Sequence, residues 1–277
     1  SLMARSCLRA LRTTAALLAV FAFVASPAAA DAGKVLVFTG TAGEPNPSTG
    51  AAAQAIQALA TANDFTADVT DDATKFTAAN LANYRAVVFV NSSGNVLNEA
   101  QEEAFQDYIE GGGGFVGIGE TALLEYDGQA FFNTLLGLSG ERVQGDPETA
   151  ARDVEFLDRV HPATRRLPLV ERRTETWYRW ATNPTGTVHT IVRVRGNTLP
   201  DGTSVTNDAV ERFTGAVAAN QPQLNRPAAW CRDIGQGRSL YTSLGSNADS
   251  VADEDFRRHL LGAIQWAAGM VRGNCKA

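Results

Sequence analysis

Short, continuously apolar segments alternate with amphipathic ones through the first half of the chain, and this alternation restricts the fold more than any other feature. The apolar segments are 34–38 (KVLVF), 86–90 (AVVFV) and 114–118 (GFVGI). Residues 51–62 carry Ala, Ile and Leu at helical spacing, and Asn98 opens another helix. Uninterrupted apolar strands between helices are typical of a parallel sheet buried on both faces. The pattern predicts an α/β fold with ligands at the carboxyl ends of these strands.

The second half of the chain has a different pattern. Strands are predicted at 154–156, 187–195 and 239–244. In 187–195 apolar and polar residues alternate, which indicates a strand with one face in solvent. We therefore expect some antiparallel strands in this half. Residues 253–271 form the last predicted helix, with acidic residues in its first turn.

The first thirty residues (1–30) have the features of a secretory signal peptide. Three arginines precede an apolar run over 15–25, and three consecutive alanines then provide small residues for cleavage. A membrane anchor is the less favoured alternative, because the run is about half the roughly 20 residues that a spanning helix needs. We expect cleavage before Asp31 and a single domain over 31–277, secreted or periplasmic. Ser1-Leu2 are interpreted as residues left by cloning.

Charge and cysteine content restrict the partners and the compartment. The formal net charge is -6, and loss of the leading arginines would make the mature chain more acidic. This argues against a nucleic-acid partner, since phosphates need a basic face. No later segment is apolar for long enough to span a membrane. Cys231 and Cys275 remain after cleavage and are expected to form one disulfide, with two free thiols as the alternative.

The stretch 111–120 (GGGGFVGIGE) contains the letters of a nucleotide-binding G-x-G-x-x-G motif. Its glycines follow a helix and run into a strand, which is the reverse of the strand-to-helix turn that directs amides at a pyrophosphate. We interpret the first four glycines as a helix end and a sharp turn. Gly119 stands where the elbow of an acyl-transfer enzyme carries Cys or Ser. Hydrolysis through a nucleophile at this elbow is therefore excluded.

A series of motifs runs along the whole mature chain. It includes KVLVFTGTAG, AVVFVNSSGNVL, YIEGGGGFVGI, HPATRRLP, ETWYRW, RPAAW and GRSLYTSLG. In this order and at this spacing, the motifs resemble the trehalose-utilisation (ThuA-like) family. The resemblance implies a flavodoxin-like three-layer sandwich with a mainly parallel sheet, similar to class I glutamine amidotransferases but without their nucleophile. It also implies an association with carbohydrate metabolism.

Four positions depart from the family pattern in the same way. Where the resemblance implies histidine, this chain has Asn46, Gly119, Arg226 and Ser246, and Glu175 replaces an aspartate. The four positions lie on loops that we expect at the carboxyl edge of the sheet. Histidines that serve one site as metal ligands or as acid and base would be lost together, whereas independent drift on exposed loops is the alternative. We predict a remodelled site with no metal and no cofactor.

Two carboxylates are the candidates for catalysis. Glu120 follows the elbow glycine, and with Glu175 it could face one cleft and act as general acid and base on a sugar. The alternative for Glu120 is a first-turn acid that bonds the amides of the following helix. Polar groups for sugar hydroxyls and flat aromatic faces for sugar rings complete the predicted site. Trp180 is a further aromatic candidate, and for Trp177, Tyr178 and Trp180 the alternative role is core packing. The substrate-binding candidates are Asn46, Asn91, Ser92, Gly119, Glu125, Trp177, Tyr178, Arg226, Ser246 and Asn247.

The chain has three histidines, and none has metal-ligand spacing with another. His161 lies in the HPAT turn, where an imidazole commonly caps local backbone. His189 is predicted on the solvent face of a strand, and His259 is predicted on the surface of the last helix.

Together these features predict a secreted ThuA-like protein that binds or processes a carbohydrate or a carbohydrate-derived small molecule. A non-catalytic extracellular module that presents the fold to a protein or polysaccharide is the alternative. A metal-dependent hydrolase is the third and least favoured hypothesis, because the expected ligands are missing. The sequence does not indicate the oligomeric state.

Overall fold

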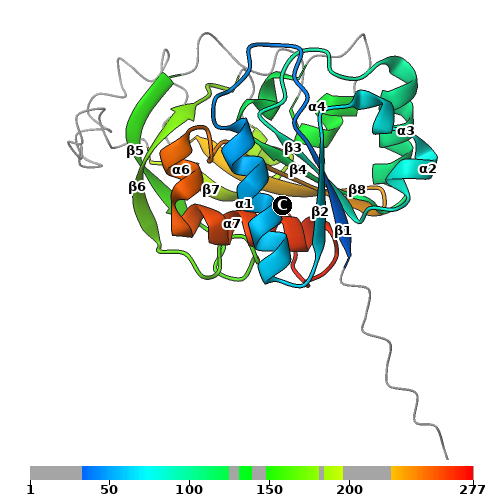
Figure 1. Cartoon of the computed structure of the whole chain (residues 1–277). Helices are drawn as coiled ribbons and strands as arrows, with labels where there is room; N and C mark the ends of the chain where they lie inside the picture. Colours follow the sequence, from blue (N-terminus) through cyan, green and yellow to red (C-terminus); the bar gives the residue numbers. More distant parts are fainter. Residues whose placement is uncertain (1–32, 125–130, 139–147, 181–183, 196–225, 277) are drawn as a thin grey trace, which may run out of the picture. The chain divides into compact units, whose positions relative to one another are not determined.

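The computed structural model of the chain describes residues 33–124, 131–138, 148–180, 184–195 and 226–276 (Figure 1). These residues lie in one compact unit, Ala32–Ala277. The predicted signal peptide and the candidate Glu125 lie outside the described residues.

The described strands form one nine-stranded sheet in the order β2-β1-β3-β4-β9-β8-β7-β5-β6. Its first half is parallel throughout, and the predicted strands are confirmed almost to the residue. The parallel strands are β1 (Lys34–Phe38), β2 (Thr66–Thr70), β3 (Ala86–Val90), β4 (Gly114–Ile118) and β9 (Gly237–Thr242).

The second half of the sheet is antiparallel, as the alternating pattern predicted. It comprises β5 (Glu148–Phe156), β6 (Val170–Trp177), β7 (His189–Val194) and β8 (Pro227–Ile234). The sequence analysis did not predict β6 or β8, and it predicted only the last residues of β5. The sheet is therefore more extensive than the sequence pattern indicated.

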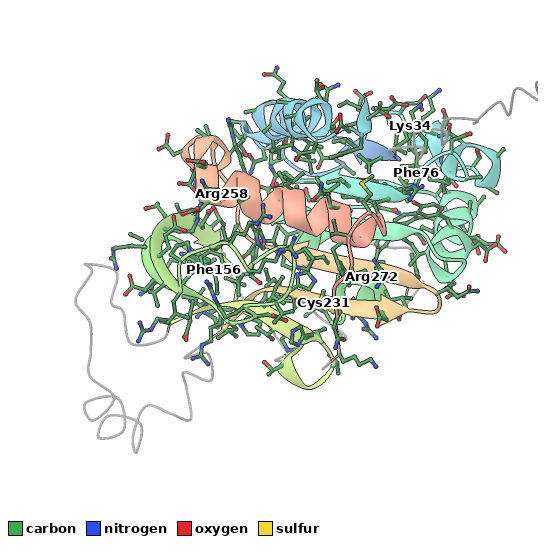
Figure 2. The ribbon with its side chains drawn as sticks, turned by 90° about the horizontal axis from the view of Figure 1, so that it is seen from below. Lys34, Phe76, Phe156, Cys231, Arg258 and Arg272 are labelled. Atoms are coloured by element: carbon green, nitrogen blue, oxygen red, sulfur yellow. A yellow bond between two sulfur atoms is a disulfide. The ribbon has the colours of Figure 1, made fainter. Side chains whose placement is uncertain are left out.

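Helices cover both faces of the parallel half. One face carries α1 (Thr49–Ala62) and α7 (Glu254–Ala267), which lie side by side in Figures 1 and 2. The other face carries α2 (Ala78–Leu81), α3 (Glu99–Glu110) and α4 (Phe131–Leu136). The remaining short elements are η1 (Ala73–Lys75), η2 (Gly119–Leu123), η3 (Pro184–Gly186) and α6 (Ala248–Ala252).

Alternate residues of each buried strand supply the two cores. Val35 and Val37 of β1 pack in a cluster with Ile56 of α1. Leu36 lies in the opposite cluster, which includes Phe105 of α3. Successive side chains of a strand point to opposite faces, so a strand covered on both sides must be apolar at every position. This explains why KVLVF, AVVFV and GFVGI are uninterrupted.

The turn from α3 into β4 is built as the four glycines predicted. Asn98 and Gln101 form a capping box that starts α3. Beyond the helix, Gly112 has a φ of 119°, a conformation that favours glycine. A Cβ on Gly114 would lie 2.2 Å from the carbonyl oxygen of Ala267. Glycine there lets the end of α7 pack directly on the sheet.

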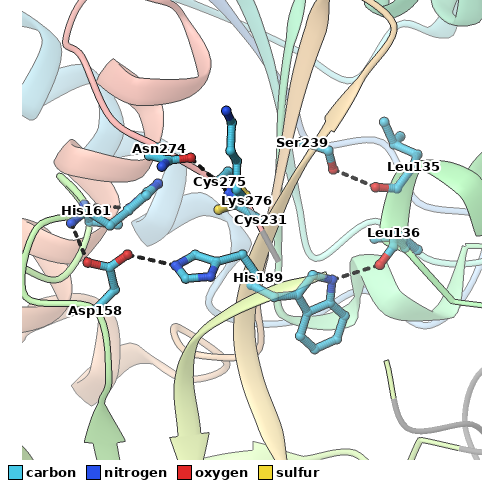
Figure 3. The surroundings of a disulfide bond; sticks show 12 residues. Leu135, Leu136, Asp158, His161, His189, Cys231, Ser239, Asn274, Cys275 and Lys276 are labelled. Carbon is cyan, nitrogen blue, oxygen red and sulfur yellow. Dashed lines mark hydrogen bonds and ion pairs between the residues drawn. A yellow bond between two sulfur atoms is a disulfide. The ribbon is translucent and has the colours of Figure 1, made fainter. Parts of the chain in front are cut away.

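The predicted disulfide between Cys231 and Cys275 is present, with an S–S distance of 2.04 Å (Figure 3). It joins β8 to the segment after α7, because the helix ends at Ala267 rather than at residue 271. Closing the loop between Cys231 and Cys275 stabilises the fold by roughly 4 kcal/mol in the chain-entropy model. Among the described residues, no helix is both long and apolar enough to cross a membrane.

Candidate functional site

Three loops at the carboxyl edge of the parallel strands meet at the side chain of Asn46. Its Nδ2 donates to Oε1 of Glu120 at 2.8 Å and to the backbone oxygen of Ser246 at 3.3 Å. Its Oδ1 accepts from the backbone N–H and the hydroxyl of Ser48, at 2.8 and 2.7 Å. One amide thus holds together the loops that follow β1, β4 and β9.

The sharp turn after β4 is made by a glycine, so no side chain projects from the elbow. Gly119 has a φ of 59°, and Asn91, at the end of β3, has a φ of 50°. A Cβ on Gly119 would lie only 2.1 Å from Oδ1 of Asn91. That oxygen accepts from the backbone N–H of Glu120 at 3.3 Å, and Nδ2 of Asn91 donates to the Ser48 hydroxyl at 3.2 Å. The Asn91 amide therefore fills the space next to the elbow, where a nucleophile or an imidazole would need room.

Glu120 is a partly exposed carboxylate at this edge. Its side chain is partly exposed and is bonded by the neutral amide of Asn46. Among the described residues, no cationic side chain lies within ion-pair distance of it. Glu120 thus keeps spare acceptor capacity and an unpaired negative charge.

Glu175 does not share this exposure, and the prediction that it faces a cleft is wrong. Its side chain is completely buried. One oxygen accepts from the N–H and the hydroxyl of Ser246, at 3.1 and 2.8 Å. The other accepts from Nε of Arg173 at 3.2 Å and from the hydroxyl of Ser250. Glu175 therefore holds Ser246 in position from the buried side of the loop.

Arg173 organises the charges behind Glu175, and the sequence analysis missed it. Its guanidinium also contacts Glu171 and Asp253, each at 2.8 Å, and donates to the Ser250 hydroxyl at 3.0 Å. Hydrogen bonding to Asp253 and the charge of Glu175 act against burial and raise the pKa of Arg173. The alternation of Arg173 with Glu171 and Glu175 in β6 was the available signal, since it places all three on one face of a strand.

The three aromatic candidates lie in the core, so the core-packing alternative holds for their rings. Trp177, Tyr178 and Trp180 are buried, and the two indole N–H groups donate to backbone oxygens of Ala150 and Pro227. The rings offer no open face for sugar stacking. Tyr178 differs in that its hydroxyl has no hydrogen-bond partner among the described residues. Burial, and to a lesser extent the charge of Glu120, raise the pKa of Tyr178, so this group remains a protonated donor.

The remaining predicted site residues divide between the site and its support. Arg226 donates to the backbone oxygen of Tyr178 at 3.4 Å, and Ser92 is buried with an unpartnered hydroxyl among the described residues. Asn247 caps α6 by accepting from Ser250 and donates to Thr174, both at 2.9 Å. These contacts use one donor and one acceptor of its partly exposed amide, and the substrate contact of Asn247 stays a prediction.

The histidines are structural residues of the core or its rim. Nδ1 of His161 accepts from the N–H of Ala163 at 3.2 Å, which confirms the predicted backbone cap. The prediction for His259 is wrong, because this residue is completely buried and bonds the Ala163 oxygen at 2.9 Å. His189 is half-buried and contacts Asp158 at 2.7 Å, and Figure 3 shows Asp158 between it and His161. Burial lowers the pKa of both His161 and His259 to about 4.

Two hollows are present, one beside Asn247, next to Ser246 of the carboxyl edge, and one at the amino edge. One, of about 490 Å³, lies between β6 and α6 and is lined by Arg173, Thr174 and Asp249, among others. The other, of about 570 Å³, lies at the amino edge beside Gly112 and Ala268. Within the described ranges, no three His, Cys, Asp or Glu side chains are grouped as metal ligands.

A family model for ThuA, described as trehalose utilisation, matches residues 34–267 of the chain. The chain belongs to the ThuA family. This membership suggests a carbohydrate-related role. Comparison with curated proteins finds no match.

Solved structures share the ThuA fold at low sequence identity. A ThuA-like protein from Bacteroides uniformis ATCC 8492 has a TM-score of 0.69 and 23% identity, over 89% of this chain and 95% of that one. A ThuA-like protein from Parabacteroides merdae ATCC 43184 has a TM-score of 0.63 and 18% identity, over 85% and 90%. A β-galactosidase from Bacillus circulans sp. alkalophilus has a TM-score of 0.53 and 11% identity, over 86% of this chain but 31% of that one.

The positions where the ThuA resemblance implied histidine are close in space. Asn46 bonds the backbone of Ser246, and a Cβ on Gly119 would lie 4.0 Å from the Cα of Ser246. Arg226 is the exception among the four positions, because its contact is with the backbone of Tyr178 and not with the other three. Ser48 also belongs to the group, although the sequence analysis did not name it. The Asn46-x-Ser48 spacing after a strand, typical of a local Asx contact, was the signal that could have identified it.

Proposed function

We propose that this ThuA-family protein binds a carbohydrate or a carbohydrate-derived small molecule at the carboxyl edge of its parallel strands. The observation that supports this most strongly is Glu120, a partly exposed carboxylate held at 2.8 Å by Asn46, with no cation beside it among the described residues. Carboxylates accept hydrogen bonds from hydroxyl groups, and the neighbouring amides and hydroxyls can donate to or accept from other hydroxyls. The family description, trehalose utilisation, supports the same ligand class.

Binding is favoured over the acid–base chemistry of two carboxylates. A general acid and base must each reach the reacting group. Glu175 is completely buried and accepts from Arg173, Ser246 and Ser250, so it cannot act together with Glu120 on a ligand. The site is then a remodelled form of a histidine site, with amide, glycine, guanidinium and hydroxyl at the four exchanged positions. A non-catalytic binding module remains the second candidate, and the same observation favours it.

The fold and the disulfide support two finer parts of the proposal. The parallel strands follow the order β2-β1-β3-β4-β9, which supports a flavodoxin-like three-layer sandwich of the amidotransferase type. The Cys231–Cys275 disulfide supports a secreted or periplasmic location, because such bonds persist in oxidising compartments.

Thermal-shift screening tests the proposed function. Neutral sugars, sugar acids and divalent metals are added to the mature protein, and a ligand that binds the native state raises its melting temperature. We expect a shift with at least one sugar, and its loss in Glu120→Gln but not in Glu103→Gln, an exposed carboxylate on α3 that serves as the matched control. Mass spectrometry of the bound sugar distinguishes binding from turnover. A shift that survives in Glu120→Gln, or one given by metals alone, would contradict the proposal.

A further inference from the structure

The connection between β5 and β6, residues 157–169, lies outside the proposed binding site and exposes apolar side chains. Val160 is 77% exposed and Leu169 is 58% exposed, and the described residues have only one other exposed large apolar side chain, on β2. Nη1 of Arg159 donates to the backbone oxygen of Leu167 at 2.7 Å, which brings the two ends of the connection together. Single exposed apolar residues are ordinary, whereas neighbouring ones mark a surface that contacts a partner.

The segment after α7, residues 269–276, lies against this connection. A Cβ on Gly273 would lie 2.7 Å from Cδ of Pro162, so the segment packs directly on the connection. The Cys231–Cys275 disulfide ties the segment to β8, and Figure 3 shows it together with the start of the connection. The two segments therefore form one surface.

Cations dominate this surface, although the whole chain has a net charge of -6. Five exposed basic side chains lie on the two segments, and none of them has a carboxylate within ion-pair distance among the described residues. Asp158 is the only Asp or Glu in the sequence of the two segments, and it is bonded to His189 at 2.7 Å. The five basic residues, which together with Val160 and Leu169 we call the basic patch, are Arg159, Arg165, Arg166, Arg272 and Lys276.

The basic patch lies at the amino edge of the parallel strands, whereas Glu120 lies at their carboxyl edge. A Cβ on Gly114, the first residue of β4, would lie 2.2 Å from the backbone oxygen of Ala267, the last residue of α7. The segment 269–276 follows directly from this point. A partner bound at the basic patch therefore leaves the carboxyl edge open to a ligand.

We propose that the basic patch docks this protein on an anionic lipid surface. Guanidinium groups bind phosphate oxygens in a bidentate manner, and each basic side chain near such a surface strengthens the attachment. Val160 and Leu169 can enter the apolar boundary below the lipid headgroups, which a soluble polyanion does not offer. Charges further than about 8 Å from the lipid are screened at physiological ionic strength, so the acidic remainder of the protein opposes the contact only weakly. This docking needs no membrane-spanning segment and does not depend on the proposed function.

Flotation with lipid vesicles tests this proposal. The mature protein, residues 31–277, is used because the apolar run of the predicted signal peptide would bind lipid by itself. Vesicles of phosphatidylcholine are compared with vesicles that also contain phosphatidylglycerol, at low and at high salt. We expect at least about tenfold tighter binding to the phosphatidylglycerol vesicles, and loss of this preference at high salt.

Charge reversal tests the cations of the basic patch. Arg165→Glu combined with Arg166→Glu should weaken binding about thirtyfold or more, because two attractive charges become repulsive. The matched control combines Arg257→Glu with Arg258→Glu on α7, which changes the net charge equally at exposed residues outside the patch. The control should bind within about twofold of the wild type.

Polar substitution tests the apolar side chains of the patch. Val160→Ser combined with Leu169→Ser should weaken binding about tenfold, because less apolar surface enters the lipid. Val69→Ser, at the exposed apolar residue of β2, should leave binding unchanged. Melting temperatures measured without vesicles verify that each variant is folded.

Three outcomes would overturn the proposal. The first is a wild-type protein that does not float with phosphatidylglycerol vesicles at low salt. The second is an equal loss of binding in the two arginine variants, which would show that net charge alone decides the attachment. The third is full binding after both serine substitutions in the patch, or binding to soluble dextran sulfate without binding to vesicles, either of which would assign the patch to a soluble polyanion. Sugar binding at the carboxyl edge is tested separately, so the proposed function stands or fails on its own.

Discussion

Carboxylates in the antiparallel half of the sheet and at the carboxyl edge of the parallel half differ in whether they are paired with a cation. In the antiparallel half, carboxylates face guanidinium groups: Arg193 contacts Glu155 at 2.8 Å and Arg172 contacts Asp153 at 3.1 Å. At the carboxyl edge of the parallel half, Glu120 is held by a neutral amide and no cation of the described residues reaches it. Paired charges contribute to the structure of a fold, whereas an unpaired acceptor remains available to a ligand. In the proposed function, the antiparallel half supports the fold and the carboxyl edge of the parallel half binds the ligand.

Lowering the pH tests the contacts that join the two halves of the sheet. Of the changes considered, it should have the largest effect on the free energy of unfolding. His259 bonds the β5–β6 connection at Ala163 and the end of β9 at Thr242, and burial lowers its pKa and that of His161 to about 4. Between pH 6.5 and 4 the unfolded chain takes up protons at these residues and the folded chain does not. The contribution of these histidines to stability should therefore fall through this window, by about 3 kcal/mol for each residue, and level off below it.

Denaturant unfolding across this pH range measures the effect. With both histidines present, the slope near pH 5 should include about 2.7 kcal/mol per pH unit from this pair. In His259→Asn the contribution should be halved, whatever the stability of the variant at pH 7. An unchanged slope would show that His259 is not held neutral in the fold.

Loss of Arg173 should break the antiparallel half more severely than loss of its neighbour. Arg173→Ala leaves Glu175 buried without its cation, and breaking a buried pair costs roughly 3–5 kcal/mol. Arg172→Ala removes a partly exposed pair with Asp153 and should cost less than about 1 kcal/mol. Urea unfolding compares the two variants, and equal losses would contradict the assignment of Arg173 as the centre of the network.

A side chain at the elbow should disturb the binding half by a smaller amount. Gly119→Ala places a Cβ in the left-handed region and against Oδ1 of Asn91, for a loss of about 2 kcal/mol. Adding Asn91→Gly should remove the clash and recover about 1 kcal/mol of it. Additive losses in the double variant would show that Asn91 does not occupy the space beside the elbow.

The accuracy of the predictions from sequence differs between the parallel and the antiparallel half of the sheet. In the parallel half each strand is buried on both faces, so β1, β3 and β4 were identified from their apolar residues alone. In the antiparallel half, β6 places Arg173 and Glu175 on its buried face, and their mutual pairing makes a core strand look polar. The alternation in β6 indicates this pair, but the contacts of Arg173 with Asp253 and Ser250, which lie far along the chain, are not visible in the pattern of one strand.

The site was predicted in part for a related reason. Strand ends predicted the loops of Asn46, Gly119 and Ser246, because carboxyl ends of parallel strands share one edge. Whether a group faces the ligand or the core depends on packing, and Glu175 and Trp177 face the core. His259 was identifiable, since it lies one turn after Phe256 on the apolar face of α7.

Hydrogen exchange with and without the best-binding neutral sugar tests the central claim most directly. The account predicts added protection of amides at the carboxyl edge, around Ser48, Asn91, Glu120 and Ser246, and little change elsewhere. Protection centred on the hollow beside Gly112 and Ala268, at the amino edge, would contradict it.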